Sequence, residues 1–388
     1  MSFAAAPSSK RAPQRILFFV GSMNAGGAER VAATLANAWA ARGDEVYLVM
    51  THLGSQHSFY ALHPQVRCVP LLHFLPRWGR WLKPWAKIRA LRAVYAHIQP
   101  DVIVSFLTNV NVNVLFALGH TAVPIIVSER THPVYSHSAT FVLRLLRRWL
   151  YSRASAVVLQ TEASARDFAQ VYTHSRPYVV IPNPIDAELL HWQPVYERPL
   201  VTPPKLVALG RLAAVKRFEL LIQAFALLPE AYADWELHIY GEGPQRSQLT
   251  QLAQQLGVHE RVFLPGRTEQ PWHKLAHAQL FALCSAYEGF PNALLEAMAL
   301  GLPCVAVDCP SGPAEMSQHG KVARLVPMDA GAPQLAQALA ELMGDPQQRR
   351  ELGRAARTSV FQHYSLEAVL CLWDNLFTTV HKEQSNSI

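Results

Sequence analysis

The chain has 388 residues, half of them hydrophobic and only 16% charged, which excludes a disordered chain and suffices for two domains of ordinary size. The net charge of +7 favours a partner that carries phosphates or anionic lipid. The first fourteen residues lack the apolar stretch of a secretion signal, and no uncharged run reaches the ~18 residues of a membrane span, so we expect a cytoplasmic protein with only peripheral membrane contact.

Apolar strands and helical patterns alternate through the first half of the chain. The apolar run at Arg15–Gly21 predicts a buried parallel strand, and a helix from about Gly27 to Arg42 follows it and stops at Gly43. Further strands are expected at Glu45–Thr51, Asp101–Phe106, Pro124–Ser128, Val157–Gln160 and Tyr178–Ile181. Such alternation predicts a parallel sheet with helices on both faces.

A proline-rich stretch then interrupts the pattern. Residues 181–204 contain six prolines, which is typical of a linker between domains. The alternation restarts with expected strands at Leu206–Gly210, Glu236–Tyr240, Val262–Leu264, Leu280–Cys284 and Pro303–Asp308. The expected helices between them are Arg217–Leu228, Gln245–Leu256 and Asn292–Leu300, and a last amphipathic helix runs from Ser365 to about Val380.

This order of elements predicts an α/β protein with two doubly wound, Rossmann-like domains that face each other across a cleft. We expect an N-terminal domain at 1–190, a C-terminal domain at 191–364, and a C-terminal helix at 365–388 that packs back on the N-terminal domain. Ligands of such sheets bind beyond the carboxyl ends of the strands, so the chemistry is expected in the loops there.

The segment 288–301 (EGFPNALLEAMALG) carries the most informative of these loops. Gly289 permits a tight turn, and Pro291 suits the first turn of a helix, whose free N–H groups can bind an anion such as a diphosphate. Glu296 lies about one turn into the helix, where it can accept hydrogen bonds from ribose hydroxyls, while Glu288 lies where a sugar on the diphosphate would hang. An ordinary strand–turn–helix with two solvated carboxylates would show the same pattern.

Two glutamates eight residues apart around GFPN resemble the EX7E signature of family 4 retaining glycosyltransferases, which have the two-domain GT-B fold. Other segments resemble that family in order and spacing, over nearly the whole chain: NAGGAER at 24–30, NPID at 183–186, Gly210-Arg211 with Lys216, YGEGP at 240–244, VFLPGR at 262–267 and SGPAE at 311–315.

The resemblance implies a role for each matching position. Arg211 and Lys216 would neutralise the leaving diphosphate, with Glu288 at the sugar as a catalytic group. Donor-binding residues would be Gly26, Gly27, Gly210, Gly241, Gly243, Arg267, Gly289, Phe290, Pro291, Asn292 and Glu296. The DxD motif of metal-dependent glycosyltransferases is absent, so we expect no cofactor and no divalent metal. Surface cations at 211 and 216 and a plain tight turn at 26–27 are the alternatives.

The family's histidine near the sugar has no unambiguous counterpart. The strand that ends at Ser128 continues as Glu129-Arg130-Thr131-His132-Pro133. His132 fills the catalytic role in one interpretation, and Glu129 and Arg130 contact the sugar or acceptor in another. A third interpretation makes His132 a plain loop residue.

Two basic, aromatic segments predict a membrane contact. Residues 74–92 carry Trp78, Trp81 and Trp85 among six cations, and residues 141–153 (FVLRLLRRWLYSR) have the same character. Tryptophan beside Lys and Arg is typical of interfacial helices, and Pro84 is expected to split the first segment into two pieces. Helices that pack these tryptophans inward are the alternative, and no nucleic-acid-binding motif is present.

The sequence therefore predicts a retaining transferase that moves a sugar from a nucleoside diphosphate to a hydroxyl of a lipid-linked saccharide or similar envelope glycan precursor, at the inner face of the membrane. Its base, its sugar and its acceptor stay open. A sugar-nucleotide epimerase shares the architecture and would convert the donor alone, and a non-catalytic nucleotide-sugar-binding protein is a third hypothesis. The intact Glu288, Glu296, Arg211 and Lys216 argue against the third.

Overall fold

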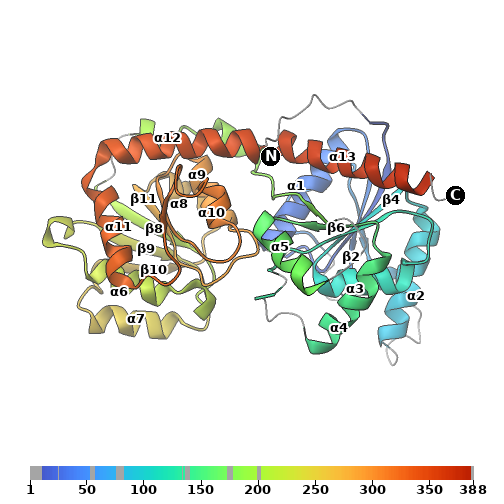
Figure 1. Ribbon diagram of the computed structural model, residues 1–388, viewed down its shortest axis with the longest axis horizontal. Coiled ribbons are helices and arrows are strands. Elements are labelled where there is room, and N and C mark those ends of the chain that lie inside the picture. Colours follow the sequence, from blue (N-terminus) through green and yellow to red (C-terminus); the bar gives the residue numbers. More distant parts are fainter. Residues whose placement is uncertain are drawn as a thin grey trace. The chain divides into compact units, whose positions relative to one another are not determined.

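The chain folds into two compact units, Met1–Pro184 with Glu367–Ile388, and Ile185–Leu366 (Figure 1). The structure, a computed structural model, describes residues 11–24, 26–52, 57–75, 83–132, 134–135, 140–172, 178–198 and 202–385. Each unit is a parallel sheet with helices on both faces, so the predicted fold class, two doubly wound α/β domains with an appended C-terminal helix, is confirmed.

The first unit holds a seven-stranded sheet in the order β3-β2-β1-β4-β5-β6-β7. Its strands are β1 (Arg15–Val20), β2 (Glu45–Met50), β3 (Arg67–Pro70), β4 (Val102–Phe106), β5 (Ile125–Ser128), β6 (Ala156–Leu159) and β7 (Tyr178–Val180). Its helices are α1 (Gly27–Ala41), α2 (Lys83–Ile98), α3 (Thr108–Leu118), α4 (Phe141–Leu150), α5 (Glu162–Val171) and α13 (Leu366–Ser385). Among the described helices of the chain, none combines the length and apolarity that a membrane crossing requires.

The strands of the first sheet are apolar on both sides because helices cover both faces. Leu17 and Phe19 pack with residues of α2, α3 and α5 in one core cluster. Their neighbour Phe18 points to the other face and meets Trp39 of α1 edge-on, with ring centroids 5.6 Å apart.

Helix α13 completes that second face. Its Trp373 is fully buried and lies edge-on to Trp39, with centroids 5.7 Å apart. Asp374 on the same helix forms ion pairs with Arg11 at 2.9 Å and with Arg42 at 2.5 Å. The last helix therefore belongs to the core of the first unit, although some 180 residues of the second unit separate it from α5 and β7 in the chain.

The second unit holds a six-stranded parallel sheet in the order β10-β9-β8-β11-β12-β13. Its strands are β8 (Lys205–Leu209), β9 (Glu236–Tyr240), β10 (Val262–Gly266), β11 (Leu280–Leu283), β12 (Cys304–Val307) and β13 (Arg324–Val326). Its helices are α6 (Phe218–Ala226), α7 (Arg246–Gln255), α8 (Pro271–Ala276), α9 (Asn292–Ala299), α10 (Pro313–Met316), α11 (Ala332–Gly344) and α12 (Pro346–His363).

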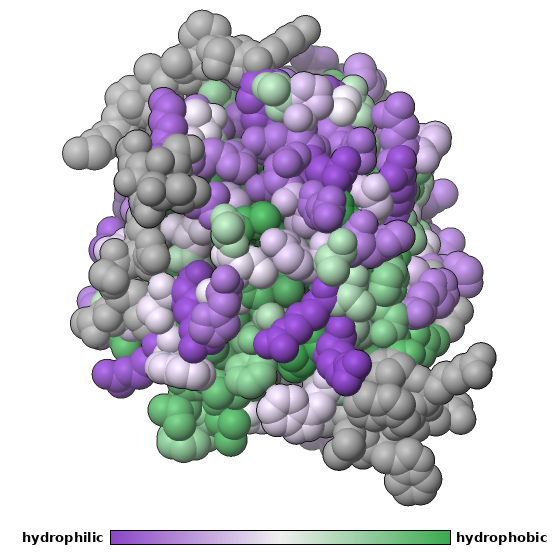
Figure 2. Space-filling model, turned by 90° about the vertical axis from the view of Figure 1, so that its right-hand side faces the viewer, coloured by the Kyte–Doolittle hydropathy of each residue, from purple (hydrophilic) through white to green (hydrophobic). Residues whose placement is uncertain are grey.

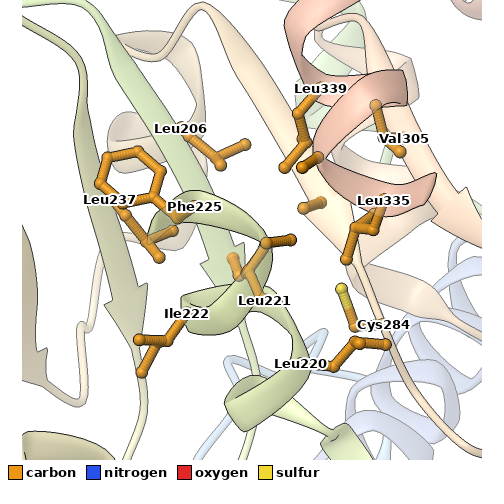
Figure 3. Close-up of a cluster of buried hydrophobic side chains, with 14 of the residues drawn as sticks. Leu206, Leu220, Leu221, Ile222, Phe225, Leu237, Cys284, Val305, Leu335 and Leu339 are labelled. Atoms are coloured by element: carbon orange, nitrogen blue, oxygen red, sulfur yellow. The ribbon is translucent and has the colours of Figure 1, made fainter. Parts of the chain in front are cut away.

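The core of the second unit again lies on both sides of the sheet. Figure 3 shows one side, where Leu206 of β8 faces Leu221 and Phe225 of α6 and Leu339 of α11. The other side packs α8, α9 and α12 against alternate residues of the same strands. This packing fixes the point where β8 and β11 end, and the loops of the candidate site begin there.

Candidate active site

The sequence-predicted donor residues of the second unit gather at one edge of its sheet. All six strands are parallel, so their carboxyl ends share that edge. The strand order reverses its direction of growth between β8 and β11, and such a switch point opens a crevice between neighbouring loops. Arg211 and Lys216 follow β8, and Glu288 follows β11, so the predicted chemistry flanks the switch point.

Lys216 and Glu288 meet directly there. The Lys216 Nζ lies 2.6 Å from Glu288 Oε1, and the Ser285 hydroxyl donates to the same oxygen at 2.5 Å. The Lys216 side chain is 23% exposed and that of Glu288 is 12% exposed, so the pair is largely shielded but remains open on one side. Two residues 72 positions apart therefore form one ion pair. Ser285, which the sequence did not single out, is a further hydrogen-bond partner of Glu288.

The loop after β9 packs against the loop after β8 through backbone that has no room for side chains. A Cβ on Gly241 would lie 1.8 Å from the Gly210 carbonyl oxygen, and one on Gly243 would lie 2.2 Å from the Leu212 carbonyl oxygen. The Leu212 amide also donates to the Glu242 carbonyl oxygen at 2.9 Å. The glycines of the YGEGP loop are therefore required for packing against the loop that carries Arg211.

The loop 288–292 leads into α9 as the sequence predicts. Phe290 and Pro291 are buried and anchor it, while Gly289 and Asn292 are partly exposed. Glu296 lies in the second turn of α9 and is 8% exposed. Ser311 holds a left-handed backbone (φ 74°) and donates its hydroxyl to the Gly289 carbonyl oxygen at 3.1 Å, which joins the loop after β12 to the loop after β11.

Three further residues complete this edge. Arg211 and Arg267 are exposed at the ends of β8 and β10. The Cys309 thiol follows β12, and burial, with a smaller contribution from Glu288, raises its pKa to about 12. Cys309 is therefore a neutral thiol beside the charged pair.

In the first unit, the residues predicted to contact the donor open helix α1 after β1. The Gly26 amide donates to the Tyr60 hydroxyl at 3.0 Å, and that hydroxyl donates to the Gly26 carbonyl oxygen at 2.9 Å. Gly27 is exposed at the first position of the helix. The turn therefore has a partner, Tyr60, which lies outside the predicted motif, and the Glu29 carboxylate lies against Gly26, 2.3 Å from where a Cβ would be.

Glu129 occupies a different place from the expected contact with sugar or acceptor. It is 1% exposed, and its Oε2 accepts the Thr108 hydroxyl at 2.6 Å. Its Oε1 accepts the Tyr151 hydroxyl and lies 3.5 Å from Arg147 Nη1. Both oxygens are occupied by groups of the first unit, so the structure corrects the expectation: this carboxylate is the buried counter-ion of Arg147.

His132 is also buried, at 1% exposure. Its Nδ1 accepts the Val134 and Tyr135 amides at 3.3 Å each, so the ring proton resides on Nε2. That atom lies 3.3 Å from the Asp167 carboxylate but is not aimed at it well enough for a hydrogen bond. Burial lowers the pKa of His132 against the opposing effect of Asp167, which favours the neutral ring. Pro133 lies outside the described residues.

Arg130 follows Glu129 but points into other surroundings. Its Nη1 donates to the Asn183 side-chain oxygen at 2.6 Å, and its guanidinium lies over the Phe106 ring, 3.6 Å from the centroid. Glu129, Arg130 and His132 thus end up in three separate environments at the carboxyl edge of the first sheet.

The two basic, aromatic segments differ in how they are placed. In 74–92, Trp78 and Trp81 lie outside the described residues, and so do Arg77 and Arg80. Helix α2 begins at Lys83, buries Ile88 and Leu91 in the core, and leaves Trp85 exposed. Pro84 therefore stands in the first turn of α2, where proline is tolerated.

Helix α4 presents the clearer hydrophobic surface, formed by Phe141, Val142, Leu145 and Trp149, which are 79%, 62%, 60% and 57% exposed. We call these four residues the α4 face. Arg144 and Arg148 are exposed on the same helix, while Arg147 turns inward to Glu129. Figure 2 shows hydrophobic side chains gathered in the lower part of the view, where α2 and α4 lie in Figure 1.

One histidine pair has the four-residue spacing of helical metal ligands. His273 lies at the start of the last turn of α8, and His277 is the first residue after the helix. Their rings stack with centroids 4.2 Å apart. Within the described ranges no group of three or more His, Cys, Asp or Glu is arranged to hold a metal ion.

Comparisons with known proteins agree with this arrangement of fold and loops. A model of "Glycosyltransferase Family 4" matches residues 25–189, and one of "Glycosyl transferases group 1" matches residues 197–359. Sucrose-phosphate synthase from Thermosynechococcus elongatus superposes with a TM-score of 0.80 at 20% identity, over 95% of this chain and all of that one. HepE of Anabaena, solved with UDP and glucose, superposes with a TM-score of 0.74 at 20% identity, over 95% and 100% of the two chains. The fold is GT-B.

Curated relatives point the same way. A Campylobacter jejuni N-acetylgalactosamine-N,N'-diacetylbacillosaminyl-diphospho-undecaprenol 4-alpha-N-acetylgalactosaminyltransferase is 26% identical over 89% of this chain and 94% of its own length. A Streptomyces coelicolor exopolysaccharide phosphotransferase is 38% identical over 47% of this chain, but the match spans only 19% of that relative. The two family models together cover both units, and the chain belongs to the family 4 glycosyltransferases.

Proposed function

We propose that this glycosyltransferase takes a sugar from a nucleoside diphosphate and transfers it, with retention of anomeric configuration and without a metal ion, to a hydroxyl of a lipid-linked saccharide or similar envelope glycan precursor. The Lys216–Glu288 pair at the switch point of the second sheet carries the proposal. It brings a cation and a carboxylate of the EX7E segment to one point, where a diphosphate and its sugar would meet.

Each charged group has a defined task in this reaction. The bond between the sugar C1 and the diphosphate oxygen breaks, the acceptor oxygen bonds to C1 on the same face, and the acceptor proton leaves with the diphosphate. Arg211 and Lys216 neutralise the charge that develops on the leaving group. Lys216 can exchange Glu288 for phosphate oxygens, which releases the Glu288 carboxylate toward the sugar.

The relatives support the classes of donor and acceptor. The Campylobacter relative is named for an acceptor on diphospho-undecaprenol, and a Salmonella typhimurium relative, 33% identical over 142 residues, is a lipopolysaccharide 1,6-galactosyltransferase. HepE was solved with UDP and glucose. A lipid-linked acceptor also explains why the α4 face and the exposed Trp85 stand beside cations, and we assign them to an anionic membrane surface.

Titration calorimetry with UDP and GDP tests the donor site. Glu296→Ala should weaken binding of the preferred nucleotide, because that carboxylate is assigned to the ribose. Glu288→Ala should retain nucleotide binding and lose turnover, since its partner is the sugar. Glu341→Ala, an exposed carboxylate on α11, is the matched control. The absence of binding of either nucleotide to the unmodified chain would overturn the proposal, and the opposite pattern in the two variants would exchange the roles.

A further inference from the structure

Arg130 is a buried cation whose hydrogen-bonding capacity is only partly used. The side chain is 7% exposed and follows β5 at the carboxyl edge of the first sheet. Nη1 is bonded to Asn183, but Nε and Nη2 are buried and have no hydrogen-bond partner in the part of the chain that the structure describes. Two buried guanidinium N–H donors without a hydrogen bond are unusual, because buried donors normally have a hydrogen-bond acceptor.

Within the described ranges, no carboxylate acts as a counter-ion of Arg130. The carboxylate of the adjacent Glu129 accepts hydrogen bonds from Thr108 and Tyr151 and forms an ion pair with Arg147. The Asn183 oxygen that Arg130 does contact also accepts the Gln160 amide at 2.7 Å. Burial alone lowers the pKa of Arg130 to about 9, so the group is still charged at neutral pH. The contacts that the described residues make with the guanidinium come from a neutral amide, Asn183, and from the Phe106 ring.

An uncompensated buried charge is destabilising by several kcal/mol, so its retention indicates a partner that arrives from outside. Nε and Nη2 form one edge of the planar guanidinium, and their two parallel N–H groups match two oxygens of a phosphate or diphosphate. We propose that this edge of Arg130 binds a phosphate-class oxyanion of the acceptor at the carboxyl edge of the first sheet. The identity of that oxyanion as part of the acceptor depends on the function proposed above.

Thermal unfolding with inorganic pyrophosphate tests the site. The full-length Arg211→Ala/Lys216→Ala variant serves as background, because the anion site of the second unit is then disabled. Pyrophosphate should raise the Tm of this background, and adding Arg130→Met should weaken the response at least roughly tenfold in concentration. Arg15→Met, at an exposed ion pair of the same unit, should leave it unchanged. An undiminished response in the Arg130→Met protein would overturn the proposal.

A second substitution separates binding from folding. Arg130 also ties Asn183 to the sheet, so Arg130→Met could be poorly folded. Arg130→Lys retains the charge and lacks the two-donor edge, and it should fold and respond more weakly to pyrophosphate. A full response in Arg130→Lys would contradict the role of the planar edge.

Two further titrations separate this site from the donor site and identify the source of the oxyanion. UDP or GDP should bind equally well to the unmodified chain and to Arg130→Met. If the unmodified chain binds neither nucleotide, the proposed function is wrong, but the pyrophosphate result at Arg130 is unaffected. Farnesyl diphosphate is then compared with pyrophosphate. Tighter binding of farnesyl diphosphate that depends on Arg130 assigns a lipid diphosphate, and equal binding of both assigns a soluble phosphorylated acceptor.

Discussion

At the scale of single residues, an ion pair holds the charge of Lys216 in place. Its ammonium lies against Glu288, which a third group, Ser285, also fixes. In the proposed reaction Lys216 exchanges this carboxylate for phosphate oxygens of the donor, so a cation already lies where the negative charge would develop. Arg211 is exposed on the same loop, so the proposed leaving-group site combines an ion-paired cation with an exposed one.

Removing either cation should therefore reduce transfer without unfolding the protein. Arg211→Ala and Lys216→Ala should each lower kcat/KM. The loss should correspond to about 2–4 kcal/mol of transition-state stabilisation. Steady-state transfer rates measure this loss, and Arg324→Ala, at an exposed ion pair with Glu341, is the matched control. Near-normal turnover in Lys216→Ala would show that the cation pair does not serve the leaving group.

How far single residues could be predicted depends on the distance in sequence of their partners. Lys216 and Glu288 were predictable because parallel strands bring their carboxyl ends to one edge. The role of Glu129 was not, since its partners Arg147 and Tyr151 lie on and after α4, and no local pattern marks them. Adjacent residues of an extended segment also point to opposite sides, which is why Glu129 and Arg130 have unrelated surroundings.

At the scale of elements, α4 has a buried and an exposed surface of different composition. Its Arg147 and Leu150 are buried, while the α4 face stays exposed together with Arg144 and Arg148. Aliphatic and aromatic side chains flanked by arginine favour the interface of an anionic bilayer. The contact is expected to weaken with salt, because screening reduces the attraction between charges.

Liposome co-sedimentation measures this contact. Leu145→Ser/Trp149→Ser should lower binding to vesicles with anionic lipid by roughly tenfold or more, as each substitution removes a buried apolar side chain from the bilayer. Leu227→Ser, at a residue of the second unit that is 55% exposed, controls for the loss of an exposed leucine. Equal sedimentation with neutral and anionic vesicles would contradict the assignment of the α4 face.

Helix α13 should be essential for the first unit. Trp373 packs against Trp39, Phe106 and Phe377 with no exposed surface. Trp373→Ala should lower the free energy of unfolding by about 3–5 kcal/mol, as for other buried aromatic truncations. Urea denaturation measures this change, and Asn375→Ala on the exposed side of the helix should shift it by less than about 0.5 kcal/mol. Equal stability of the two variants would mean that α13 is only loosely attached.

At the scale of the whole molecule, the alternation of apolar strands and amphipathic helices made the two sheets predictable. The edge strand β3 was missed because its residues Arg67 and Cys68 are exposed and form no continuous apolar run. Helices α11 and α12 were also not anticipated; α12 in particular carries many charged and polar residues around a narrow buried stripe. The last helix was expected to pack back on the N-terminal domain, and α13 belongs to the first unit, where it contacts Trp39 and Arg11.

The most direct test of the central claim is the anomeric configuration of the product. The chain is incubated in excess EDTA with a panel of α-linked UDP and GDP sugars and an isoprenyl-diphosphate-linked saccharide, and the product is analysed by NMR. We predict a new α-glycosidic bond formed from one of these donors without added metal. A β-linked product, transfer only after Mg²⁺ or Mn²⁺ is restored, or conversion of the donor alone into a different sugar nucleotide would contradict a metal-independent retaining glycosyltransferase.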